Sequence, residues 1–180
     1  MTLPRLSIAA LSVLACSFLF PSSSSVSANH DDEGGDRMSF FALLESFNEV
    51  PAISSTGRGS FRARLSADGL TLHYKESFSG LSAPVTQSHI HFGQRHTAGA
   101  VMVFLCQTSG NPDPTGLAPQ CVNEGTVEGD ITAANIIKAG NQGIDVGEFA
   151  EFLRALRHES GYANVHTTMF LGGEIRGQIR

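Results

Sequence analysis

Residues 61–75 read FRARLSADGLTLHYK, and the pattern of this stretch indicates the fold class of the chain. Apolar and polar side chains alternate before the Asp68-Gly69 pair, and the alternation resumes after it. A period of two residues is typical of a half-buried strand, and an Asp-Gly pair favours the tight turn of a hairpin. The stretch therefore predicts an antiparallel β-hairpin with one face in the core.

Further short stretches have the composition of strands and are separated by turn residues. They are residues 39–44, 85–92, 101–105, 126–131, 163–169 and 174–179. The stretch 101–105 is apolar throughout, which predicts a central strand buried on both faces. This number of short strands predicts a mainly β fold, an immunoglobulin-like or superoxide-dismutase-like antiparallel β-sandwich.

One short helix is expected near the C-terminus. Asp145 and Glu148 have the spacing of a capping box. The apolar residues that follow fall on one helical face: Phe149, Phe152, Leu153 and Leu156. Gly161 stands where such a helix would end.

The first 28 residues have the features of a secretory signal peptide. Arg5 precedes an apolar run at 6–20, and Val26 and Ala28 place small residues where signal peptidase cuts. We expect cleavage after Ala28, which leaves 152 of the 180 residues. A lipoprotein cut before Cys16 is the alternative, which the apolar residues following that cysteine disfavour.

The mature chain divides into a short arm and one domain. Residues 29–37 are polar and acidic, which predicts a flexible arm, and 38–180 have the length of a single domain. No other segment is long and apolar enough for a membrane span. The formal charge of −5 offers no basic face for nucleic acid. We therefore expect a secreted protein, extracellular or periplasmic.

Two cysteines remain once the signal peptide is removed, Cys106 and Cys121. In an oxidising compartment an even pair predicts a disulfide bond. Glycines and prolines in the intervening loop preclude regular structure there, and closing a loop of that length contributes about 3 kcal/mol of stability. Two free buried thiols are the alternative.

Several stretches, in combination and in this order, resemble the CHRD (chordin) domain family. They are 48–52 (NEVPA), 88–93 (SHIHFG), the segment from Cys106 to Cys121, 129–134 (GDITAA), 162–167 (YANVHT) and 173–178 (GEIRGQ). Together they extend over nearly the whole mature chain. The resemblance implies an immunoglobulin-like β-sandwich, distantly similar to copper/zinc superoxide dismutases, and it implies no settled molecular function.

Two histidines of the central stretch, His89 and His91, are two residues apart. Residues i and i+2 of a strand share a face, so both imidazoles could reach one metal ion, a geometry suited to copper. His166, on another predicted strand, is the expected third ligand, and His96 is its reserve. Metal affinity would fall as the imidazoles protonate below about pH 6.

Residues 89–101 are also similar to the copper-ligand strand of the dismutases. This chain, however, has no histidine between His96 and His158, where the bridging and zinc-binding histidines of those enzymes would fall. The departure disfavours a zinc subsite and superoxide dismutation. Arg176 could lie near a mononuclear copper site, as an arginine does in the dismutases, which is an argument by analogy.

The same histidines could instead be buried side chains with hydrogen-bonded rings. Asn164, Thr167 or Glu174 could supply the partners, and such networks need no metal. Around a metal site, Asn164, Glu174 and Arg176 are the residues expected behind the ligands. Glu174 and Arg176 share a face of the last predicted strand, which favours a structural salt bridge or a cross-strand pair.

Two functions stay open on the sequence. The first is a non-enzymatic extracellular binding or structural module for an undetermined protein or small ligand. The second is a mononuclear copper-binding protein, a carrier or a redox protein. The chain has no nucleophile elbow and no phosphate-binding glycine loop, so the sequence favours a protein that is not an enzyme.

Overall fold

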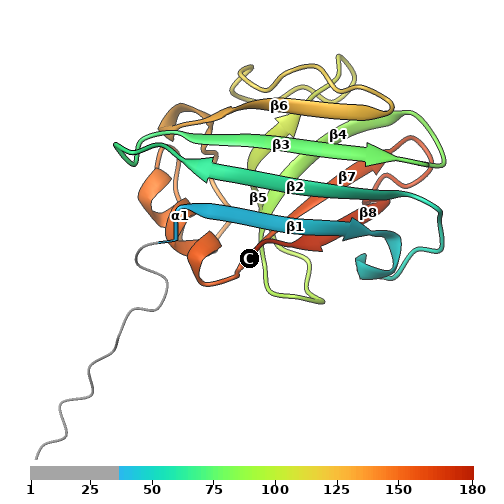
Figure 1. Cartoon of the computed structure of the whole chain (residues 1–180), viewed down its shortest axis with the longest axis horizontal. Helices are drawn as coiled ribbons and strands as arrows, with labels where there is room; N and C mark the ends of the chain where they lie inside the picture. Colours follow the sequence, from blue (N-terminus) through green and yellow to red (C-terminus); the bar gives the residue numbers. More distant parts are fainter. Residues whose placement is uncertain (1–36) are drawn as a thin grey trace, which may run out of the picture. The chain divides into compact units, whose positions relative to one another are not determined.

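The computed structural model describes residues 37–180, whose regular structure is almost entirely β-strand (Figure 1). The strands are β1 (Ser39–Glu45), β2 (Arg58–Leu65), β3 (Leu72–Ser79), β4 (Val85–Phe92), β5 (Ala100–Cys106), β6 (Gly125–Ile131), β7 (Gly161–Thr167) and β8 (Ile175–Gln178). This part of the chain has one α-helix, α1 (Phe149–Arg157), and two 3-10 turns, η1 (Ser46–Asn48) and η2 (Ala133–Asn135). Within it, no helix has the length and hydropathy needed to cross a membrane.

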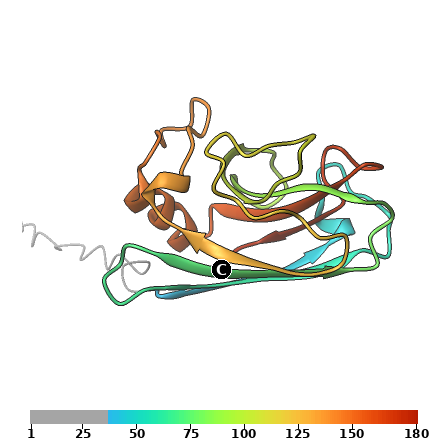
Figure 2. The same ribbon diagram turned by 90° about the horizontal axis from the view of Figure 1, so that it is seen from above.

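The eight strands form one antiparallel sheet in the order β5-β4-β7-β8-β1-β2-β3-β6. The two halves of this sheet lie over each other as two layers (Figure 2), and the strands at its two ends, β5 and β6, contact each other. The layers are joined through β1 and β8, where Glu45 pairs with Arg176. The predicted mainly β, antiparallel fold is therefore confirmed, as a single nearly closed sheet.

The predicted hairpin is formed by β2 and β3, with Ala63 opposite Tyr74. Its inward side chains are all buried: Phe61, Ala63, Leu65, Leu72 and Tyr74. At the turn, the Asp68 carboxylate accepts a hydrogen bond from the backbone of Leu70, and Gly69 has a φ of 73°. Glycine adopts this left-handed conformation without steric cost, so the Asp-Gly pair suits the turn.

The core fills the space between the two layers. Fully buried side chains there include Leu44, Phe61, Ile90, Met102, Leu105 and Ile175. The helix α1 adds Phe152 and Leu156 to the same cluster. The period-two pattern of β1, β2 and β3 thus separates a buried core face from an outer face that is open to polar groups, whereas β7 is buried at every position.

The predicted helix is present, but its ends differ from the prediction. Glu148 accepts a hydrogen bond from the backbone of Asp145, which is one half of a capping box. The helix ends at Arg157, and the chain turns through Glu159 at a φ of 52°. Gly161 therefore does not terminate the helix and instead begins β7, where a side chain would overlap Leu156.

The stretch 101–105 forms a strand, β5, but the prediction of a central position is wrong. β5 lies at one end of the sheet order. Its outer edge is covered by irregular chain, because Ile137 donates a backbone hydrogen bond to Met102 and Cys121 donates one to Gln107. This cover explains why an end strand can be apolar along its length.

The predicted disulfide bond between Cys106 and Cys121 is present, and these cysteines are 15 residues apart. It ties the end of β5 to the loop that leads to β6. The predicted signal peptide, the alternative cut at Cys16 and all but the last residue of the predicted arm lie outside the described residues.

Candidate metal centre

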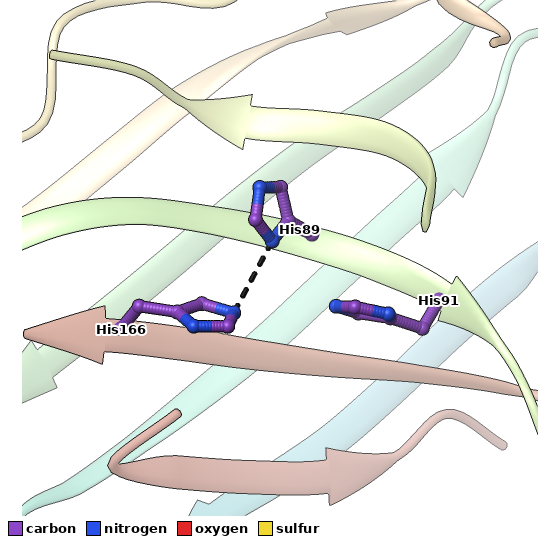
Figure 3. Close-up of side chains that lie close together, drawn as sticks. All are labelled: His89, His91 and His166. Atoms are coloured by element: carbon purple, nitrogen blue, oxygen red, sulfur yellow. Dashed lines mark hydrogen bonds between the residues drawn. The ribbon is translucent and has the colours of Figure 1, made fainter. Parts of the chain in front are cut away.

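Three histidines of two neighbouring strands lie together on one face of the sheet (Figure 3). β4 carries His89 and His91, and β7 carries His166. The strands pair so that His89 lies opposite Asn164. Ile90, between the two β4 histidines, points into the core. The histidines therefore occupy the face of the β4–β7 pair that is directed away from the core.

One nitrogen of each ring lies within 4.8 Å of the corresponding nitrogens of the other two rings. The shortest separation is 3.2 Å, between His89 Nδ1 and His166 Nε2. Three points no more than 4.8 Å apart lie within about 2.8 Å of a common centre. Since metal–imidazole bonds measure about 2.0 to 2.1 Å, the rings would have to close in by less than about 1 Å to share one ion.

Two of the rings are held by backbone carbonyls on the side away from this centre. His91 Nδ1 lies 2.9 Å from the Gly99 carbonyl oxygen, and His166 Nδ1 lies 2.9 Å from that of Leu171. A carbonyl oxygen only accepts, so each Nδ1 carries the hydrogen and each Nε2 of these neutral rings has a free lone pair. Metal-binding histidines in proteins typically have this arrangement.

On the inner side of the cluster, His91 Nε2 is buried and has no hydrogen-bond partner among the described residues. His89 faces the other rings with Nδ1, which lies within hydrogen-bond distance of His166 Nε2, and its buried Nε2, also without a partner, points away from them (Figure 3). His166 Nε2 faces the Asn164 side-chain oxygen at 3.0 Å, which sets a lone pair against an acceptor. A cation between them would remove this repulsion. An Asn164 amide turned over would also remove it, provided that Glu49 were protonated to donate to the amide oxygen.

Burial keeps the three rings uncharged. His89 is only 3% exposed and His166 only 6%. Burial, with smaller contributions from the other two histidines, lowers the pKa of His89 to about 2. Burial also lowers the pKa of His91 to about 4, against the hydrogen bond to Gly99, and it lowers the pKa of His166. The neutral, metal-binding form thus extends well below the pH 6 limit expected from free imidazoles.

Arg176 lies near the cluster and contacts Tyr162 and the loop between β4 and β5. Its guanidinium lies 3.4 Å from the centre of the Tyr162 ring, and Tyr162 stacks on His91 with ring centres 4.7 Å apart. Arg176 Nη2 also donates hydrogen bonds to the carbonyls of Gln94 and Thr97. Arg176 therefore holds the loop between β4 and β5 beside His91.

The other predicted residues have different positions. Glu174 accepts hydrogen bonds from the backbone and hydroxyl of Ser82 and from the Thr167 hydroxyl. Residues 37–180 contain no ion pair between Glu174 and Arg176. His96 is exposed in the loop between β4 and β5, at a φ of 66°, and is not one of the three converging histidines.

Glu49 is a member of this site that the sequence did not reveal. It is 7% exposed, and burial raises its pKa to about 7, against its bond to Asn164 and the charge of Arg176. Asn164 Nδ2 donates to Glu49 Oε1 at 3.4 Å, and a side chain on Gly173 would overlap both groups. The sequence shows Glu49 only as the acidic residue of the NEVPA stretch, and its burial could not be predicted because it depends on the final fold.

Comparison with protein families identifies a CHRD domain over residues 40–179, which is nearly all of the described chain. A search of curated proteins finds no significant match. A search of solved structures finds none either.

Proposed function

The chain belongs to the CHRD domain family, a family of extracellular-type modules. From the histidine cluster, we propose that it is a module that binds one transition-metal ion through His89, His91 and His166. The observation that carries the proposal is the convergence of three neutral imidazoles, two of which already donate their outer N–H groups to backbone carbonyls. Copper is the expected metal, because imidazole ligands suit it.

The protein's part in such a site is to hold and enclose the ion. The Gly99 and Leu171 carbonyls orient two of the rings, and Tyr162 covers the face of His91. Bound copper would supply one-electron chemistry or would itself be the cargo of a carrier. Among residues 37–180, the cluster contains no Cys, Asp or Glu, so every protein ligand would be an imidazole.

The test is the metal content and copper affinity of the purified mature domain beside two triple variants. The site variant is His89→Ala/His91→Ala/His166→Ala. The control is His73→Ala/His96→Ala/His158→Ala, which removes the same number of imidazoles outside the cluster. Circular dichroism and the intact disulfide establish that both variants fold. We expect near-stoichiometric copper in the wild type and control, and at least a 100-fold loss of affinity in the site variant. Equal weak binding by all three proteins would contradict the proposal.

A second candidate function, binding of an acidic extracellular partner, is supported by the outer face of β1, β2 and β3. A hollow of about 650 Å³ on this face is lined in part by Phe41, Arg62 and Arg64. The Arg62 guanidinium lies 5.4 Å from the Phe41 ring centre, and within residues 37–180 neither arginine takes part in an ion pair. Unpaired guanidiniums beside an exposed aromatic ring favour an anionic ligand.

Retention on a heparin column tests this second function, with the sulfated polymer as a polyanion probe. We expect the wild type to elute at a higher salt concentration than Arg62→Glu/Arg64→Glu. The control Arg154→Glu/Arg157→Glu changes the net charge by the same amount on α1. Equal elution of wild type and the β2 variant would exclude this face as an anion-binding surface.

A further inference from the structure

We infer that the histidine triad selects copper(I) over copper(II) and zinc(II), because its protein ligands are all neutral and its surroundings oppose a second positive charge. This inference rests on the proposed metal site. It concerns which ion the site holds, so it can fail while metal binding itself stands.

The charge around the triad disfavours a divalent ion. Three imidazoles contribute no negative charge, and the described cluster contains no carboxylate or thiolate. A cation, Arg176, lies nearby, with its guanidinium over the ring that stacks on His91. The one carboxyl nearby among the described residues, Glu49, is separated from His166 by Asn164 and interacts with Arg176. No anionic group in this part of the chain therefore touches the triad to compensate a divalent ion.

The burial of the ligands also favours a monovalent ion. His89 and His166 are almost completely buried, and the free Nε2 of His91 is shielded from solvent. The cost of moving an ion from water into a less polar medium rises with the square of its charge, so a divalent ion pays about four times the cost of a monovalent ion of equal size. Enclosure by neutral donors therefore favours the monovalent ion.

The number of donor nitrogens also suits copper(I). Three converging nitrogens satisfy copper(I), a d¹⁰ ion that accepts low coordination numbers. Copper(II) prefers a tetragonal set of ligands and zinc a tetrahedral set of four. Each would need a further ligand, from water or from the Asn164 oxygen that lies 3.0 Å from His166 Nε2.

A matched substitution at Asn164 tests the preference for copper(I). Asn164→Asp keeps the shape of the side chain and places a carboxylate beside His166 Nε2, where it supplies both negative charge and a hard oxygen ligand. The control Asn141→Asp adds the same charge at an exposed position. Copper(I) affinity is measured in the absence of oxygen by competition with bicinchoninate. Copper(II) and zinc(II) affinities are measured by competition with chelators. The midpoint potential of the copper-loaded protein is measured by redox titration.

For the wild type we expect a dissociation constant for copper(I) at least 100-fold below that for copper(II). The copper(II)/copper(I) midpoint potential of the protein should then exceed that of the same couple in water by about 120 mV for each 100-fold preference. Asn164→Asp should reduce the preference at least tenfold, and Asn141→Asp should leave it unchanged. Copper(II) or zinc(II) bound as tightly as copper(I) by the wild type would overturn this inference and leave the metal site intact. The absence of binding by all three ions would overturn both proposals.

Discussion

His89 Nδ1 lies 3.2 Å from His166 Nε2, although 77 residues separate these histidines in the chain. They come from adjacent antiparallel strands, in which Gln87 is the direct partner of His166 and Asn164 the direct partner of His89. The two histidines are therefore diagonal neighbours on one face. This cross-strand contact converts a His-X-His pair into a three-histidine cluster.

Copper binding should persist in mild acid. Burial holds the pKa of His89 at about 2 and that of His91 at about 4, so protons compete weakly with the metal at pH 5. We expect copper affinity at pH 5 to lie within about tenfold of its value at pH 7, measured by competition titration. Free imidazole titrated alongside is the reference, and an equally steep loss of affinity by the protein would contradict the prediction.

Without metal, His89 and His91 should contribute a loss of stability as the pH falls. The pKa values of His89 and His91 lie below the value of about 6.5 expected in the unfolded chain, so only the unfolded state takes up protons as the pH drops from 6.5 towards 4. This histidine contribution should lower the free energy of unfolding by at least about 2 kcal/mol between pH 7 and pH 4. The raised pKa values of Glu49 and Glu76 act in the opposite direction over the same range. Urea unfolding at each pH measures this.

The variant His89→Gln/His91→Gln separates the histidine contribution from that of the carboxylates. It should lose less stability over the same pH range than the wild type. Parallel curves for the two proteins would mean that the rings are not buried as neutral groups.

Stability should also fall as the pH rises, because of Glu76. This side chain has no exposed surface, and burial raises its pKa to about 8, against the hydrogen bond from Ser88. Between pH 4.5 and 8 the unfolded chain releases this proton while the folded chain retains it, so the contribution of Glu76 to the free energy of unfolding decreases across that range. We expect Tm to be lower by about 5 °C or more at pH 9 than at pH 5.

Glu76→Gln removes that titration and keeps the shape of the side chain. Its Tm should depend less on pH than that of the wild type, with a residual slope from Glu49, whose pKa is about 7. The control Glu128→Gln, on the exposed face of β6, should follow the wild-type curve. An unchanged pH slope in Glu76→Gln would refute the assignment of a buried neutral acid.

Removal of the disulfide bond should destabilise the domain without altering the histidine cluster. The bond closes a segment of 15 residues, and a cross-link of that length contributes about 3 kcal/mol in the chain-entropy account. Cys106→Ala/Cys121→Ala should therefore lower the free energy of unfolding by about 2 to 5 kcal/mol, measured with urea. Copper affinity under folding conditions should be unchanged, and a simultaneous loss of affinity would show that the loop also supports the site.

Gly99 should be indispensable to the loop that supports His91. A side chain at this position would overlap the Phe92 carbonyl, and the Gly99 backbone both accepts from His91 and donates to the Tyr162 hydroxyl. We expect Gly99→Ala to cost about 3 kcal/mol and to weaken copper binding. Gly110→Ala is the matched control, since nothing lies within 4 Å of the added carbon. Equal stability of the two variants would contradict the prediction.

Local patterns in the sequence were sufficient to predict the elements of this fold. The alternation in residues 61–75, the Asp68-Gly69 turn and the amphipathic residues after Glu148 all concern neighbours within one element. Such neighbours are related by the geometry of the strand or helix itself, so spacing alone predicts which side is buried. The pairing of Cys106 with Cys121 was predictable for a different reason, because removal of the expected signal peptide leaves no other cysteine.

From the sequence alone one can therefore predict the strands, the hairpin, the helix and the disulfide, together with the histidines that could share a metal. The folded chain was needed to show that β5 ends the sheet, that His166 meets His89, that Arg176 lies over Tyr162 and that Glu49 is buried behind Asn164. The physical reason is that these contacts depend on the register between strands distant in the chain. A shift of one residue in the pairing of β4 with β7 would turn His166 into the core.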